Sequence, residues 1–151
     1  MEIKLNTLKI INYDSNNEIH RKAKYEILRD DNFKKYFGDF FIKDSDLYFQ
    51  DSNSLETKKI YWVTDQNNIV GMVRIFSYHQ LGYVNIQYAV LPNYRNLGYG
   101  KRILQEFSSY LMSQENVVCV EGEIDKNNAG SIKIATQIGY EQENNKYRFR
   151  K

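Results

Sequence analysis

The segment 88–101 combines residue types that can bind a phosphate group. It reads YAVLPNYRNLGYGK, and its apolar start ends at Pro92, the only proline of the chain. Proline has no amide hydrogen to donate to a sheet, so we expect a strand to end there. Gly98 and Gly100 carry no β-carbon, which lets backbone amides approach a ligand closely. The pattern predicts a strand, a glycine-containing turn and an anion-binding site.

An amphipathic helix is predicted directly after the two glycines. Its apolar residues recur at helical spacing and are Ile103, Leu104, Phe107, Tyr110 and Leu111. The free amides of a helix N-terminus and the positive end of its dipole attract anions. Arg95 and Lys101 add positive charge at the mouth of this site. A tight turn whose glycines only ease packing is the alternative that this pattern leaves open.

Two other phosphate-binding patterns fail at this position. The loop of nucleotide hydrolases needs Gly-x-x-x-x-Gly-Lys followed by Ser or Thr, whereas this chain has Arg95 at the first glycine and Arg102 after Lys101. The dinucleotide fingerprint needs a third glycine where Ile103 stands. Neither a nucleotide hydrolase nor a dinucleotide-binding fold is therefore favoured.

Two segments resemble one known family. RNLGYG at 95–100 resembles the Arg/Gln-x-x-Gly-x-Gly/Ala signature of the GNAT family of N-acetyltransferases. The segment 128–140, NAGSIKIATQIGY, is similar to the family block that starts with Asn-x-x-Ser/Ala and ends with Gly-Phe/Tyr. Together the similar segments span about residues 60–140, and the resemblance extends to the branch of ribosomal-protein N-terminal acetyltransferases.

The resemblance implies a binding site for acetyl-CoA as co-substrate. Family members bind it in a V-shaped opening between the fourth and fifth strands of their sheet. Backbone groups of Ala89, Val90 and Leu91 would pair with the pantetheine arm, and the side chain of Asn128 would contact the cofactor. The amides that would hold the pyrophosphate belong to Arg95, Asn96, Leu97, Gly98, Tyr99, Gly100 and Lys101. The implied acceptor is a primary amine of a small molecule or of a protein N-terminus.

The thiolate partner departs from the common family pattern. The transfer removes protons from the amine and returns one to the leaving thiolate. Many members use a tyrosine for the second task, and this chain has Ala135 at that position. The resemblance to the N-terminal acetyltransferase branch suggests Ser131 as the thiolate partner, and a polar residue in the first turn of a helix is the competing interpretation.

The sequence offers several candidates for the general base that would remove a proton from the acceptor amine. No Asp or Glu occurs between Asp65 and Glu106, which excludes a carboxylate from the implied fourth strand. Histidine is the side chain suited to proton transfer near neutral pH, and His79 is the nearest one to this strand. A histidine at a strand end is usually a surface residue. Glu121 and Glu123 share one strand face; either could line the acceptor side, and a solvated edge is the alternative. Two further options remain for removing the proton from the amine. Asn85, Gln87 or Tyr88 could order a chain of water molecules, or the acceptor amine could have a pKa low enough to need no strong base.

Bulk properties favour one soluble, cytoplasmic domain spanning residues 1–151. The net charge is +2 with both signs interspersed, so we expect no nucleic-acid partner. The chain starts without a signal-peptide pattern and has no run long enough to span a bilayer, so no membrane association is expected. The single Cys119 lies in an apolar run, which indicates a buried residue, no disulfide and no metal site.

The predicted elements belong to an α/β (α+β) fold. Strands are expected at 1–11, 60–63, 69–78, 83–91 and 117–124, with a final strand or a hairpin turning at Asn144-Asn145 over 140–150. Helices are expected after a capping box at 15–18 and at 33–42, 98–113 and 128–138. This order predicts a mixed, mostly antiparallel sheet with helices on both faces. Pairing of the 140–150 edge could form a homodimer.

The N-terminal third carries no motif. His20 is expected at the surface of the first helix. Aromatic residues of this region form either an acceptor pocket or the core beneath two short helices; they are Phe33, Tyr36, Phe37, Phe40, Phe41, Tyr48 and Phe49. Three functions follow: an N-acetyltransferase, a non-catalytic acyl-CoA-binding module, and a nucleotide-phosphate binder that uses the same glycines.

Overall fold

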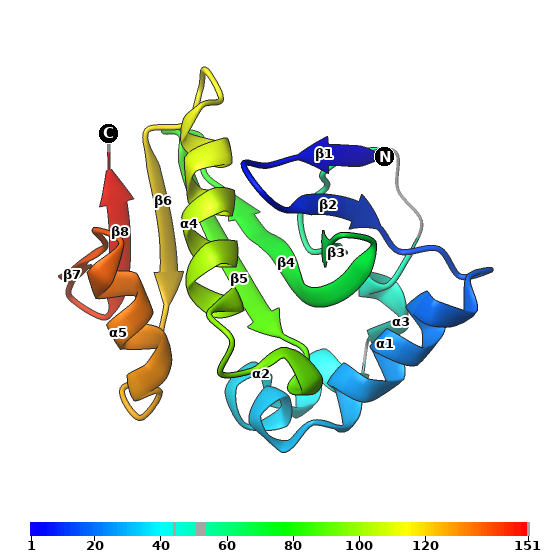
Figure 1. The fold of residues 1–151 in the computed structure, drawn as a ribbon. Coiled ribbons are helices and arrows are strands. Elements are labelled where there is room, and N and C mark those ends of the chain that lie inside the picture. Colours follow the sequence, from blue (N-terminus) through cyan, green and yellow to red (C-terminus); the bar gives the residue numbers. More distant parts are fainter. Residues whose placement is uncertain (44, 51–53, 151) are drawn as a thin grey trace.

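The computed structural model describes residues 1–43, 45–50 and 54–150, and its described strands form one mixed sheet (Figure 1). The strand order is β1-β2-β3-β4-β5-β6-β8-β7, and all neighbours are antiparallel except β5 and β6. The strands are β1 (Glu2–Lys4), β2 (Lys9–Asn12), β3 (Ile60–Asp65), β4 (Asn68–Tyr78), β5 (Tyr83–Val90), β6 (Cys119–Glu123), β7 (Glu141–Glu143) and β8 (Lys146–Arg150). The predicted mixed, mostly antiparallel sheet is confirmed.

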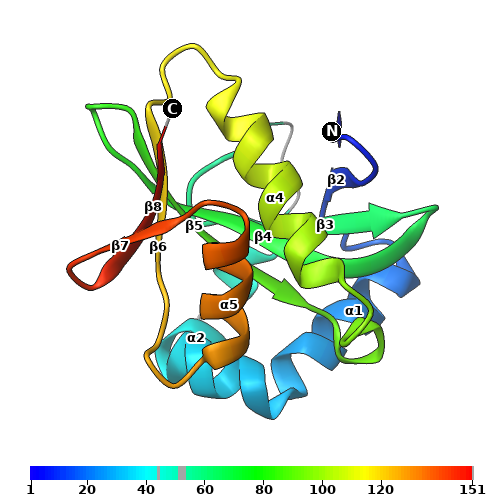
Figure 2. The same cartoon turned by 60° about the vertical axis from the view of Figure 1, so that its left-hand side comes forward.

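Helices cover both faces of the sheet, as Figures 1 and 2 show. One face packs against α4 (Tyr99–Met112) and α5 (Ala129–Gln137). The other packs against α1 (Glu18–Arg29) and α2 (Asp31–Lys43), with the short α3 (Ser45–Tyr48) following in the chain. On β3, alternate residues face the two cores, which explains why the strand is apolar without interruption. None of the described helices has the length and apolar character of a membrane-crossing segment.

The sheet splits between β5 and β6. The two strands pair only at Tyr83 with Cys119, Val84 with Val120, and Asn85 with Glu121. Beyond this point β6 continues toward α5, and the rest of β5 has no partner on that side. A β-carbon on Gly122 would lie 3.2 Å from the carbonyl oxygen of Ile86, so glycine permits the close approach at the apex of the split. The split leaves an open edge on β5 beside α5.

The first predicted strand is in fact two strands. β1 and β2 form a hairpin whose turn is closed by the bond from the Leu5 amide to the Leu8 carbonyl. The expected capping box at 15–18 is also wrong: the Asn17 side chain accepts hydrogen bonds from the amides of Ile19 and His20 and caps α1. An asparagine two residues later supplies the same acceptor chemistry, so the start of the helix was predictable but its cap was not.

His20 is buried, which contradicts its predicted surface position. Its side chain is 8% exposed, and its Nδ1 accepts a hydrogen bond from the amide of Asp14 at 2.9 Å. Of the aromatic residues at 33–49, Phe33 and Phe49 belong to the core beneath α1 and α2. The side chains of Phe40 and Phe41 lie outside the described part of the chain.

Candidate active site

The turn between β5 and α4 presents a run of uncommitted backbone amides. A 3-10 turn at Pro92–Tyr94 ends the strand segment, and α4 begins at Tyr99 after Gly98, whose φ is +86°. No amide from Asn96 to Lys101 donates a hydrogen bond within the described structure. A β-carbon on Gly98 would meet nothing within 4 Å. These amides can bind an anion at the helix N-terminus.

The open edge of β5 presents backbone groups of alternate residues. The amide of Leu91 donates to the carbonyl of Val70 at 2.9 Å, so Leu91 faces β4. Backbone groups alternate in direction along a strand, and Ala89 therefore also faces β4, whereas Tyr88 and Val90 face the opening. Of the three residues predicted to pair with a pantetheine arm, only Val90 presents its backbone to the opening, and Tyr88 joins it there.

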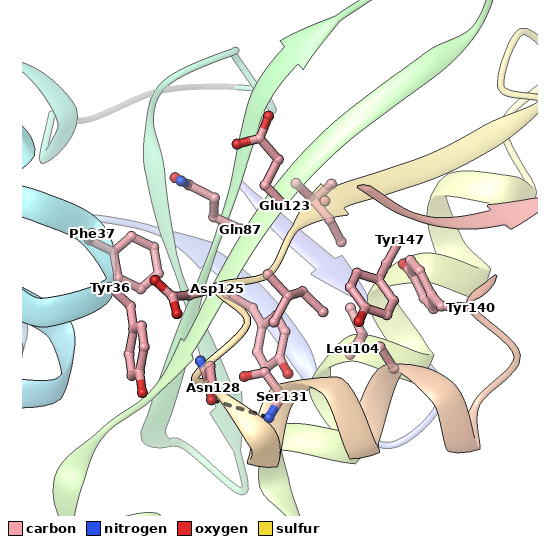
Figure 3. Close-up of a pocket in the computed structure, with 15 residues that line it drawn as sticks. Tyr36, Phe37, Gln87, Leu104, Glu123, Asp125, Asn128, Ser131, Tyr140 and Tyr147 are labelled. Carbon is pink, nitrogen blue, oxygen red and sulfur yellow. Dashed lines mark hydrogen bonds between the residues drawn. The ribbon is translucent and has the colours of Figure 1, made fainter. Parts of the chain in front are cut away.

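An outer groove connects the turn before α4 with this open edge. It has a volume of about 540 Å³ and lies between the turn, β5, α5 and the start of α2. A smaller inner pocket of about 100 Å³ lies at the split between β5 and β6 (Figure 3). Five residues line both spaces: Tyr36, Phe37, Tyr88, Asn128 and Ser131. A long ligand bound at the turn can therefore reach the inner pocket.

The two predicted cationic residues differ in their contacts. Arg95 lines the outer groove, but its guanidinium forms two hydrogen bonds with the carboxylate of Asp30, at 2.8 and 2.7 Å. Lys101 lines the same groove, is exposed, and makes no ion pair within the described residues. Lys101 is therefore available to bind an anion, whereas the guanidinium of Arg95 is occupied by its ion pair with Asp30.

Hydroxyl groups gather where the outer groove meets the inner pocket. Asn128 caps α5 by accepting a hydrogen bond from the Ser131 amide at 3.3 Å, which places Ser131 in the first turn of that helix (Figure 3). Tyr88 reaches the same region from β5, and Tyr140 is committed to a hydrogen bond with Ser108. Sequence reasoning named Asn128 and Ser131, and the structure brings both to the groove.

His79 does not reach the groove. It lies in the turn between β4 and β5, is exposed, and its Nδ1 accepts a hydrogen bond from the amide of Leu81. The first three residues of β5 pair with β6, so the split begins well beyond His79 along the strand. The strand geometry separates the only histidine near this segment from the inner pocket.

The two glutamates of β6 have different surroundings. Glu121 is buried and pairs with Arg148 at 2.9 Å and with Lys146 at 3.4 Å, so the expected solvated edge is wrong for this residue. Glu123 is exposed, lines the inner pocket and makes no ion pair within the described chain. Opposite it, Gln87 accepts a hydrogen bond from the buried Arg74 at 2.9 Å. Glu123 is thus the free carboxylate of this strand at the pocket.

The inner pocket combines aromatic and acidic side chains. Figure 3 shows Tyr36 and Phe37 on α2 and Asp125 after β6 on one side, with Tyr140 and Tyr147 on the other. The aromatic segment near 33–49 thus contributes two residues to the groove as well as core residues. Asp125 was missed, because a single aspartate in a polar loop carries no sequence signal.

Comparisons with known proteins identify the family and the fold of the chain. Residues 23–140 match the model described as the Acetyltransferase (GNAT) family. A solved acetyltransferase (GNAT family) from Bacillus anthracis superposes with a TM-score of 0.78 at 19% identity, covering 99% of this chain and 98% of that chain. RimL, a ribosomal L7/L12 alpha-N-protein acetyltransferase in complex with coenzyme A, gives 0.75 at 15% identity, covering 99% and 98%.

A spermidine N-acetyltransferase from Vibrio cholerae, in complex with CoA and spermine, gives a TM-score of 0.74 at 13% identity and covers 95% of each chain. No curated protein sequence matches this chain. At these identities the likeness to solved structures concerns the fold.

Proposed function

Because the chain belongs to the acetyltransferase (GNAT) family, we propose that it transfers an acetyl group from acetyl-CoA to a primary amine of a small molecule or of a protein N-terminus. One observation carries the proposal. The uncommitted amides from Asn96 to Lys101 lie on a groove that continues along the open edge of β5 to the inner pocket. A ligand with phosphates at one end and a reactive group at the other matches that shape.

Different residues of the groove would bind different parts of the acetyl-CoA molecule. The amides at the start of α4 and the ammonium of Lys101 hold the phosphates. The backbone edges of Tyr88 and Val90 orient the arm between the phosphates and the acyl group. Acetyl-CoA supplies the activated acyl group when bound, and the split between β5 and β6 is where an amine can meet it.

The amine enters from the side of the pocket that carries Glu123 and Asp125. These carboxylates attract an ammonium group, and the ring of Tyr36 can contact a cation over its face. Glu123 accepts a proton from the amine directly or through a water molecule, because it is the uncommitted carboxylate of β6 at the pocket.

The proposal is tested by binding and turnover together. Acetyl-CoA and CoA should raise the melting temperature, whereas ATP at the same concentration should raise it far less, since ATP lacks the pantetheine arm that follows β5. A panel of amines should then release free thiol from acetyl-CoA. Absence of any melting shift with acyl-CoAs would contradict the cofactor assignment, and a shift with ATP equal to that with CoA would favour a nucleotide-phosphate binder.

A non-catalytic acyl-CoA-binding module is the second candidate. It is favoured by Ala135, which is fully buried at the position of the common family tyrosine, and by a β5 strand without a carboxylate. This candidate predicts the same melting shift but no thiol release with any amine. Amine-dependent thiol release above the rate without protein would exclude it.

A further inference from the structure

Tyr88 carries a hydroxyl group that the fold buries without a hydrogen-bond partner. Its oxygen is excluded from solvent and makes no hydrogen bond with any described residue. Among the described side chains, the only other such atom is the indole nitrogen of Trp62, which lies in the core beneath α1 and α2. A buried polar group without a partner destabilises a protein, so its presence in a native fold requires a reason.

The position of Tyr88 indicates that reason. Its side chain lines both the outer groove and the inner pocket. A β-carbon on Gly100 would lie 3.9 Å from its Cε2 atom, so the ring packs beneath the start of α4. Ser131, in the first turn of α5, lies close enough to influence its ionisation, although the two hydroxyls do not form a hydrogen bond. Tyr88 thus stands at the junction of the two spaces.

Ala135 lines the inner pocket and lies one helical turn after Ser131 on α5. It is fully buried and carries only a methyl group, so α5 contributes no hydroxyl at this position. The hydroxyl of Tyr140 could supply a hydrogen bond to a ligand only by giving up its hydrogen bond with Ser108. Among the tyrosines that line the inner pocket in the described structure, Tyr88 is the one whose buried hydroxyl has no partner.

We infer that the Tyr88 hydroxyl donates a hydrogen bond to the sulfur of the acyl donor and stabilises the negative charge that sulfur gains during the transfer. This inference rests on the proposed function. The amine nitrogen forms a bond to the acyl carbon, and the C–S bond breaks with its electron pair on sulfur. An ammonium acceptor loses two protons in all: one ends on sulfur to give the thiol, and one goes to the solvent. Tyr88 keeps its own proton throughout.

The chemistry of the phenol supports a donor that is not itself deprotonated. Burial raises the pKa of Tyr88, and the Ser131 hydroxyl opposes the rise only in part. A thiol titrates at about 8.5, so a phenol with a raised pKa is a poor proton source for a thiolate. The same rise keeps the phenol protonated at neutral pH, which preserves the hydrogen bond. Preorganised donors of this kind stabilise charge that develops during a reaction.

The test measures the thiol pKa of bound CoA. Thiolate absorbance is followed in a pH titration of the CoA complex, with the desulfo-CoA complex as the reference for tyrosine ionisation. We expect the bound thiol to titrate about 1 pH unit higher in Tyr88→Phe, a roughly tenfold shift in the thiol–thiolate equilibrium. An identical thiol pKa in both proteins would overturn the inference.

Other charges at the pocket cannot produce the same result. The carboxylates there raise a thiol pKa, because they repel a thiolate. The helix N-termini lower it equally in both proteins, since the substitution does not alter them. The titratable groups that line the pocket besides Tyr88 are Tyr36, Glu123, Asp125, Tyr140 and Tyr147. The difference between the two proteins therefore isolates the hydroxyl.

Stability provides a second readout with a matched control. Tyr88→Phe removes an unpartnered buried hydroxyl, so we expect the melting temperature of the free protein to rise by roughly 2–4 °C. Tyr61 is a buried tyrosine away from the groove, and its hydroxyl bonds the carbonyl of Ser54 and the amide of Glu56, each at 2.7 Å. Tyr61→Phe should lower the melting temperature and leave the thiol pKa unchanged. A loss of stability in Tyr88→Phe would mark the hydroxyl as structural and contradict the inference.

The binding data separate this inference from the proposed function. If the unsubstituted protein fails to bind CoA, the proposed function fails. If both proteins bind CoA and desulfo-CoA equally well and the thiol pKa does not change, only the role of Tyr88 fails. If Tyr88→Phe weakens both ligands to the same extent, the side chain shapes the groove and its hydroxyl does not contact sulfur, which also overturns the inference.

Discussion

Arg95 and Asp30 form a two-point ion pair that joins the turn between β5 and α4 to the start of α2. Asp30 ends α1, and its carboxylate also accepts a hydrogen bond from the amide of Phe33 at 2.9 Å, which caps α2. The helix that carries Tyr36 and Phe37 is thereby tied to the turn on the opposite side of the groove. One carboxylate holds two walls of the candidate site together.

The ion pair should be measurable through the pH dependence of stability. Arg95 holds the pKa of Asp30 below its ordinary value of 3.8. A carboxyl group with a lowered pKa stabilises the fold above that value, and the contribution is lost as the pH falls through the folded pKa. We expect Asp30→Asn to lower the free energy of unfolding by about 1 kcal/mol at pH 7. Denaturant unfolding should show this difference shrinking below pH 3.8.

The capping role of the same side chain has its own control. Asparagine caps a helix about as well as aspartate, so Asp30→Asn removes the ion pair and keeps the cap. Asp30→Ala removes both and should cost about 1 kcal/mol more. An equal loss in the two variants would show that Asp30 does not cap α2, and a pH-independent loss would contradict the ion pair.

The left-handed backbone at Gly98 should be needed for cofactor binding. Its φ of +86° is strained for a β-branched residue and is tolerated by asparagine. We expect Gly98→Val to abolish the melting shift with acetyl-CoA, whereas Gly98→Asn should retain most of it. Because a β-carbon meets nothing within 4 Å, the comparison tests backbone conformation and not crowding. Equal binding by both variants would argue against a role for this conformation.

Lys101 should contribute more to phosphate binding than its exposure suggests. It is the uncommitted cation at the start of α4, so Lys101→Glu should weaken acetyl-CoA binding by roughly tenfold or more and reduce the salt dependence of the affinity. Lys4→Glu makes the same charge change on β1, far from the groove in sequence and fold, and serves as the control. Calorimetric titration at two salt concentrations measures both effects. Equal weakening in the two variants would indicate a net-charge effect only.

Ser131 should affect turnover more than affinity if it assists the leaving sulfur. We expect Ser131→Ala to lower the rate of amine-dependent thiol release by roughly a hundredfold, with the dissociation constant for CoA nearly unchanged. The amide of residue 131 would still donate its hydrogen bond to the Asn128 side chain, so the first turn of α5 should persist. Parallel losses in rate and affinity would assign Ser131 a structural role.

His79 should be dispensable. It lies in the exposed turn between β4 and β5, so His79→Ala should leave the pH profile of acetyl transfer unchanged. Glu123→Gln should lower the rate if the Glu123 carboxylate accepts the amine proton. Initial rates between pH 6 and 9 measure both variants. Loss of a near-neutral ionisation in His79→Ala would contradict the placement of the base at the inner pocket.

Local patterns predicted the central elements correctly, because the interactions that form them are local. Pro92 ends a strand, Gly98 supplies a left-handed residue, and apolar spacing marks α4; each acts within a few positions. The N-terminal third was harder because its caps and turns use interchangeable polar residues. Asn17 and not the expected Ser15 caps α1, and His20 is buried by contacts with Tyr13 and Asp14 that no helical spacing reveals.

The sequence by itself determined the resemblance to the GNAT family and predicted an anion site between β5 and α4. Tertiary structure decided which charges are free for the ligand, because Asp30 meets Arg95 across 65 positions of the chain. It also decided which strand edge is open, since β5 and β6 pair for only three residues. The Tyr88 hydroxyl is buried without a partner because α4, α5 and β5 pack around it. These elements are far apart in the sequence, so no local pattern predicts this environment.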